Sequence, residues 1–199
     1  MVTDQERRQE LERTCGQVVM RSWSEPDFKR RLFEDPAAVL AENGLPAPEG
    51  IELRALEQSE EVRFLVLPPA DGGKPSGEEA RRAVRALDLD PGRREEFEEK
   101  GGRVVERAWS DPAFRRRLLA DPAAVLAEQG LGVPDGIEVK GVEQAGNVRY
   151  FVLPPAPRTR ELTEEELEHV SGGLVVIAII AVLIGLLVPA VQSVRGHPA

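Results

Sequence analysis

The octapeptide Asp35-Pro-Ala-Ala-Val-Leu-Ala-Glu42 recurs unchanged as Asp121-Pro-Ala-Ala-Val-Leu-Ala-Glu128, 86 residues further along the chain. At the same offset, Val62-Arg-Phe-Leu-Val-Leu-Pro-Pro69 matches Val148-Arg-Tyr-Phe-Val-Leu-Pro-Pro155. A period of this length is too long for the common solenoid repeats. The duplication therefore predicts two tandem small modules of the same fold.

Each module is predicted to belong to the α+β class, with helices followed by a β-hairpin. In the repeated octapeptide, Asp35 or Asp121 is an N-cap and the next residue is Pro at the first helical position. Before the octapeptide, each module is expected to have a longer helix that ends near Trp23 or Trp109. A short helix follows it, and Ser24 or Ser110 is expected to be the N-cap of this short helix. The predicted strands have one buried face each, in the first module made of Ile51, Leu53 and Ala55 and of Val62, Phe64 and Val66.

Large apolar side chains at matching positions are expected to form the two cores. They are Trp23, Phe28, Leu40 and Phe64 in the first module, and Trp109, Phe114, Leu126 and Tyr150 in the second. The predicted organisation is a first module over 1–70, a linker over 71–77, a second module over 78–157, a leader helix with a cleavage signal over 158–173 and a hydrophobic segment over 174–199.

The end of the acidic part of the chain carries a second pattern. Thr163 and Glu166 have the spacing of a capping box, which predicts a short helix with Leu167 and Val170 on one apolar stripe. Gly172-Gly173 follows, and the composition then changes abruptly to an apolar run that begins at Leu174. Most Gly-Gly pairs only end a helix and begin a linker, and that reading stays open here.

With Leu162 included, this pattern resembles a double-glycine leader. The resemblance implies that a papain-like peptidase, fused to an ABC transporter, cuts after Gly173. It also implies a set of peptidase-recognition residues upstream of the cut. They are Leu162, Thr163, Glu166, Leu167 and Val170, and the cleavage site itself is Gly172, Gly173 and Leu174.

The modules themselves resemble the nitrile hydratase alpha-subunit family, most clearly through Trp109-Ser-Asp-Pro-Ala-Phe-Arg-x-Arg-Leu-Leu-x-Asp-Pro122. In that family a cysteine-rich loop after the second strand holds iron or cobalt. Leu67-Pro68-Pro69 and Leu153-Pro154-Pro155 stand at the corresponding places, so the resemblance implies no metal ligands, no cofactor and no hydratase activity. Together with the double glycine, the modules resemble nitrile hydratase-like leader peptides of ribosomal natural-product precursors.

That resemblance implies a non-enzymatic, bacteriocin-like precursor, whose duplicated leader is recognised in the cytoplasm by modification enzymes and by the peptidase-containing transporter. The released segment 174–199 would be exported or membrane-associated. Its start also resembles the N-terminal helix of type IV pilin-like proteins. As a helix, Leu174 to Val188 measures about 22 Å and Leu174 to Val194 about 31 Å, against a bilayer core of roughly 30 Å, so residues 174–194 are the expected membrane contact.

Composition excludes some functions and leaves an alternative. A net charge of −9 and a pI near 5.0, without a basic stripe, argue against nucleic acid as a partner. Cys15 is the only cysteine, which excludes an internal disulfide and is typical of a reducing compartment. The alternative function is a tail-anchored membrane protein with an acidic cytosolic binding domain.

Overall fold

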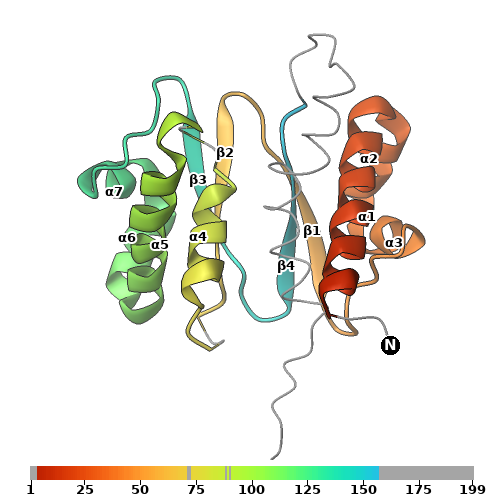
Figure 1. Cartoon of the computed structure of the whole chain (residues 1–199), viewed down its shortest axis with the longest axis horizontal. Helices are drawn as coiled ribbons and strands as arrows, with labels where there is room; N and C mark the ends of the chain where they lie inside the picture. The colour runs from red at the N-terminus through yellow and green to blue at the C-terminus, as the bar shows by residue number, and fades with distance from the viewer. Residues whose placement is uncertain (1–3, 71–72, 88, 90, 157–199) are drawn as a thin grey trace, which may run out of the picture.

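The computed structural model describes residues 4–70, 73–87, 89 and 91–156 of the 199-residue chain. Helices α1, α2 and α3 lie on one side of the molecule, helices α4 to α7 lie on the other, and the four strands run between these two groups (Figure 1). The first half contains α1 (Asp4–Ser24), α2 (Pro26–Glu34), α3 (Pro36–Glu42), β1 (Glu52–Glu57) and β2 (Val62–Leu67). The second half contains α4 (Gly77–Arg85), the 3₁₀ turn η1 (Pro91–Arg93), α5 (Arg94–Ser110), α6 (Pro112–Ala120), α7 (Pro122–Glu128), β3 (Glu138–Glu143) and β4 (Val148–Leu153).

The repeated octapeptide forms α3 and α7 as its capping residues predict. The Asp35 side chain accepts a hydrogen bond from Ala38 N at 3.0 Å, and Asp121 does the same for Ala124 N. Gly44 and Gly130, with φ of 82° and 74°, adopt the left-handed conformation just after each helix. Local sequence therefore determines this element in both halves.

The strand pairing differs from the predicted hairpins. Strand β1 pairs in parallel with β4, with Glu52 opposite Val148, and β2 pairs in parallel with β3, with Val62 opposite Glu138. Each half thus gives one strand to the other half, and each sheet has two strands within the described part of the chain. The hairpin prediction was wrong because a short loop allows antiparallel pairing but does not exclude a partner 76 to 96 residues away, as these registers require.

The exchange makes each core from both halves of the sequence. Phe151 and Leu153 of β4 lie in the core of α1, α2 and α3, while Leu65 and Leu67 of β2 lie in the core of α4 to α7. All four side chains are fully buried. Neither core is complete without a strand from the other module.

In β2 the face that carries Leu65 and Leu67 is buried, although the alternation predicted burial of the opposite face, with Val62, Phe64 and Val66. Leu65 and Leu67 point into the helical core, and Val66, on the opposite face, is only 7% exposed. Phe64 is partly buried, although the alternation placed it in the core. The prediction assumed one covered face, whereas the end of β2 is covered on both.

The other expected core residues divide by type. Phe28, Leu40, Phe114 and Leu126 are buried, whereas Trp23, Trp109 and Tyr150 are partly exposed. The predicted hydrophobic helix over 174–199 lies outside the described residues. Within the described part of the chain, no helix is both long enough and apolar enough to cross a membrane.

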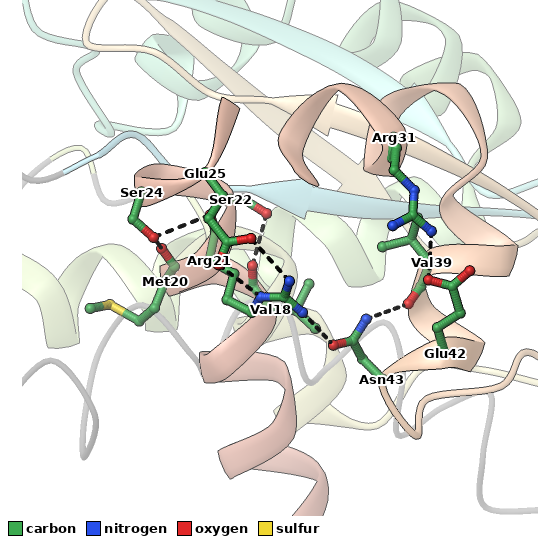
Figure 2. Close-up of polar contacts among 10 residues, drawn as sticks. All are labelled: Val18, Met20, Arg21, Ser22, Ser24, Glu25, Arg31, Val39, Glu42 and Asn43. Carbon is green, nitrogen blue, oxygen red and sulfur yellow. Dashed lines mark hydrogen bonds and ion pairs between the residues drawn. The ribbon is translucent and has the colours of Figure 1, made fainter. Parts of the chain in front are cut away.

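A polar cluster joins the end of α1 to the two helices that follow it (Figure 2). The Arg21 guanidinium donates to both carboxylate oxygens of Glu25, at 3.1 and 3.0 Å, and to Asn43 Oδ1 at 3.2 Å. It also lies 4.1 Å from the centre of the Phe28 ring. Ser24 does not cap α2 as predicted: its hydroxyl donates to Met20 O in α1, and the N-cap is Glu25.

The Arg21–Glu25 pair gives a prediction for acid stability. The hydrogen bond from Arg21 holds the pKa of Glu25 below its usual value of 4.5. A carboxylate with a lowered folded-state pKa adds stability at higher pH and loses it as the pH falls through that pKa. We expect Glu25→Gln to reduce the pH dependence of the unfolding free energy, measured in urea between about pH 3 and pH 6. The same change in an Arg21→Gln background should have little further effect.

Candidate functional site

The predicted cleavage and recognition residues, 162–174, lie outside the described residues, and so does everything after residue 156. The structure instead describes the end of β4 and the residues up to 156 that follow it. We call the start of this stretch, at Pro154, an exit, and its duplicate follows β2 at Pro68. We take the two exits as the candidate functional site.

The exit after β4 is held by α1. The indole Nε1 of Trp23 donates to the carbonyl oxygen of Pro154 at 3.1 Å, across 131 residues of sequence. Next to this strand end, Gln58 N donates to Leu153 O at 2.8 Å, and the Lys29 ammonium pairs with the Glu57 carboxylate. The segment that follows β4 therefore begins at a fixed place beside α1.

The exit after β2 has the same plan with different donors. Gln144 N donates to Leu67 O at 3.0 Å, which matches the Gln58 contact. Arg115, the counterpart of Lys29, is 6% exposed and donates to Pro68 O at 2.5 Å and, through Nε, to Glu143 at 2.9 Å. Arginine can reach the carboxylate and the carbonyl together because its planar fork carries several donors.

With arginine at the position of Lys29, the second exit contains two buried donors that make no hydrogen bond. Among the described residues, Trp109 Nε1 and Arg115 Nη1 are buried and have no hydrogen-bond partner. The duplication pairs Trp109 with Pro68 as Trp23 is paired with Pro154, but Arg115 already donates to the Pro68 oxygen. The two exits thus have the same geometry and different hydrogen bonding.

The difference between the exits gives a prediction for the two tryptophans. Trp23→Phe removes a hydrogen bond, whereas Trp109→Phe removes a donor that has no partner. We expect Trp23→Phe to lower the free energy of unfolding by about 1 kcal/mol more than Trp109→Phe. Urea unfolding of the two variants measures this difference. Equal losses would show that the Trp23–Pro154 bond adds nothing to stability.

Sequence reasoning named the two tryptophans only as core residues and missed the charged residues at the exits, although a signal for them was present. The 86-residue offset pairs Lys29 with Arg115 and Glu57 with Glu143, so a basic and an acidic position recur together in both halves. It also missed α4, which begins with a capping box between Ser76 and Glu79. Apolar anchors were compared between the modules, but recurring polar pairs were not.

Comparison with known proteins shows what the chain is similar to. The family model described as nitrile hydratase, alpha chain, matches residues 2–67 and 113–175. The low-molecular weight cobalt-containing nitrile hydratase subunit alpha of Rhodococcus rhodochrous is 29% identical over 153 residues, which is 76% of this chain and 63% of that protein. The cobalt-containing nitrile hydratase subunit alpha of Pseudonocardia thermophila is 28% identical, with 76% and 64% covered. The chain thus spans less than two thirds of the length of these two relatives.

A shorter relative has a different name. Polytheonamide B, from a bacterial symbiont of Theonella swinhoei, is 30% identical over 107 residues, which is 49% of this chain and 72% of that protein. Among solved structures, a double mutant of the Fe-type nitrile hydratase from Comamonas testosteroni Ni1 has a TM-score of 0.53 at 19% identity and covers 93% of this chain and 80% of its own. At that identity the likeness concerns the fold alone.

These findings correct the function expected from the sequence. The bacteriocin-like precursor, its tail-anchored alternative and the absence of enzymatic activity are contradicted, because the relatives include nitrile hydratase alpha subunits and, at 35% identity over 63 residues, the thiocyanate hydrolase subunit gamma of Thiobacillus thioparus. The error came from giving the segment after residue 157 more weight than the modules, which make up most of the chain.

Proposed function

Because this chain belongs to the nitrile hydratase alpha-chain family, we propose that it acts as a binding domain of that family, which takes a protein partner beside the end of β4. The observation that supports this most directly is the exit at Pro154, where Trp23 fixes the start of the segment that follows β4. The family fold supplies the rigid body, and the segment supplies the part on which a partner acts.

The metal of the cobalt-containing relatives does not fit the residues present. Cobalt in such a site needs several soft or nitrogen donors close together. The sole cysteine of the chain, Cys15, is buried in α1, and the described residues contain no group of three His, Cys, Asp or Glu side chains that could hold a metal. Leu67 and Pro68 bring no metal-ligating side chain to the end of β2. We therefore derive no step through a metal.

A protein partner agrees with the names of the relatives, several of which are subunits. For this chain we propose a peptidase that cuts between Gly173 and Leu174, carried by a transporter. Glycines allow close approach of an extended backbone to a narrow cleft. Leu162, Leu167 and Val170 would form its apolar contact, next to the predicted capping box of Thr163 and Glu166.

The apolar run after the cut suggests a second contact. Each central Leu, Ile or Val favours transfer into a bilayer by roughly 0.3–0.6 kcal/mol. We propose that residues 174–194 contact a membrane. Flotation of the full chain with lipid vesicles measures this, and a chain that stays at the bottom of the gradient contradicts it.

Processing is tested with the full chain and a purified peptidase domain specific for double glycines. The wild type should give a fragment that begins at Leu174, identified by intact mass. Leu167→Asp should slow cleavage at least about tenfold, because it places a charge in an apolar contact. Glu165→Asp, on the opposite side of the predicted helix, is the matched control and should be cut at the wild-type rate. Equal rates for all three would overturn the proposed recognition residues.

A further inference from the structure

Each half of the molecule places an arginine over a phenylalanine ring at the end of its long helix. The Cζ of Arg21 lies 4.1 Å from the centre of the Phe28 ring, and the Cζ of Arg107 lies 4.2 Å from the centre of the Phe114 ring. The 86-residue offset pairs these residues, so the stack is a duplicated feature. A guanidinium is attracted to the face of an aromatic ring and keeps its N–H donors for other partners. The stack therefore fixes the place of both guanidinium groups.

In the first half this arginine binds a carboxylate. Figure 2 shows the Arg21 guanidinium between Glu25 and Asn43. Two of its nitrogens donate to the two carboxylate oxygens of Glu25, at 3.1 and 3.0 Å, and the third donates to Asn43 Oδ1 at 3.2 Å. Paired hydrogen bonds between a guanidinium and a carboxylate fix the orientation of the two groups and add energy. All three nitrogens of Arg21 thus have an acceptor.

In the second half, Asp111 stands at the position of Glu25 and has a different role. Its Oδ1 accepts hydrogen bonds from Ala113 N and Phe114 N, both at 3.0 Å, so its side chain caps α6. Glu25 makes no such bond to α2. Aspartate is a preferred N-cap residue, and its side chain is shorter than that of glutamate. Because this carboxylate is held at the start of α6, it does not pair with Arg107.

The second acceptor is missing as well. Gln129 stands at the position of Asn43, is exposed, and makes no side-chain hydrogen bond with any residue that the structure describes. The guanidinium of Arg107 is also exposed, and within the described ranges its only interaction is the stack on Phe114. Arg107 is therefore held in place like its counterpart, with its donors open to solvent.

We propose that the Arg107 guanidinium binds an acidic side chain of a partner protein, in the paired arrangement that Glu25 makes with Arg21. The duplicate site identifies the ligand chemistry, because it holds a carboxylate on the same stacked arginine. An exposed ion pair adds little affinity alone, so the site orients a partner that is held by a larger contact. It does not depend on the contact proposed beside β4, because α5 and α6 lie on the other side of the strands from α1 (Figure 1).

A carboxylate titration of the full-length protein tests the site. The probe is sodium acetate, followed through the Nε–Hε NMR signals of the arginines and compared with sodium chloride at the same ionic strength. Arg116 is the matched control, because it is exposed and has neither a ring nor an ionic partner among the described residues. We expect acetate to bind Arg107 at least about threefold more tightly than Arg116, because the stack holds its donors in one orientation. Equal affinities would show only the contact that any exposed arginine makes with an anion, and would overturn the proposal.

Exchanging the two acidic residues gives a second test, in which the chain supplies its own competitor. Asp111→Glu should place a carboxylate on Arg107, so its affinity for acetate should fall to that of Arg116. Glu25→Asp should have the opposite effect, because the shorter side chain can cap α2 and leave Arg21 open to acetate. Both changes keep the charge, and the amide spectrum verifies that the variants are folded. An unchanged response of Arg107 in Asp111→Glu, or of Arg21 in Glu25→Asp, would overturn the assignment.

Two further probes distinguish a side chain from the end of a chain. N-acetylglutamate amide carries the carboxylate of a glutamate side chain, and N-acetylglycine carries that of a C-terminus. We expect the first to bind Arg107 at least as tightly as acetate. Tighter binding of the second would identify a C-terminal carboxylate as the ligand and overturn the assignment to an acidic side chain.

Discussion

Replacing Phe151 by alanine is expected to lower the free energy of unfolding by about 3–5 kcal/mol. Phe151 belongs to the second half of the sequence, yet its fully buried ring lies in the core of α1, α2 and α3. Hydrogen exchange should therefore lose protection mainly in these three helices. Urea unfolding gives the size of the effect and exchange gives its location.

The matched variant is Leu65→Ala at the duplicate position in β2. Leu65 is fully buried in the core of α4 to α7, so its removal should cost about 2–5 kcal/mol and reduce protection in those helices. The two variants should thus affect opposite sides of the molecule. If each reduced protection in the helices of its own module, the strand exchange would be wrong.

The second large effect is expected from Gly141→Ala in β3. A Cβ at this position would lie 2.8 Å from Leu119 Cα and 3.0 Å from Leu119 O. Both atoms belong to the backbone of α6, which cannot yield by changing a rotamer. We expect a loss of about 1–3 kcal/mol in the free energy of unfolding, as for other overpacked sites.

Gly132→Ala is the control for this prediction. No heavy atom lies within 4 Å of a Cβ at Gly132, and its φ is not positive. The change should alter the free energy of unfolding by no more than about 0.5 kcal/mol. A comparable loss in both variants would mean that the cost at Gly141 comes from the glycine backbone and not from the contact with α6.

The sequence predicted the elements whose causes are local. Asp35 caps α3 and Gly44 follows it because the capping oxygen and the missing Cβ act within a few residues. The end of α1 next to Trp23 was also close to its predicted place. The cap of α2 was not, because Glu25 is held by Arg21 and the Ser24 hydroxyl donates back into α1.

The partners of the strands could not be predicted in the same way. Alternation along β2 says that one face is covered and does not say by which segment. Because the two halves are alike in sequence, β1 can in principle pair with β2 of its own half or with β4 of the other half. The alternation of side chains along β1 is compatible with both pairings. The burial of Leu65 and Leu67 in the core of α4 to α7, on the face opposite the predicted Val66, is evidence for the second arrangement that only the structure supplies.

Near the end of the chain, the resemblance to a double-glycine leader predicted a cleavage site after Gly173 and spacing predicted an apolar stripe; both lie beyond the described residues and stay predictions. The contacts that fix the exits were not predictable from spacing. Trp23 and Pro154 are 131 residues apart, and Arg115 reaches Pro68 across 47. Such contacts exist only after the strands have exchanged, so a reading that keeps each module separate cannot include them.

The exchange also sets the order in which the protein can be completed during synthesis. The partner of Glu52 is Val148, which leaves the ribosome 96 residues later. At cellular rates this delay is on the order of ten seconds. Until then the nascent α1, α2 and α3 lack Phe151 and Leu153 and expose part of their apolar surface. The N-terminal half is therefore the last to close, and it closes just as the segment beyond Pro154 is being made.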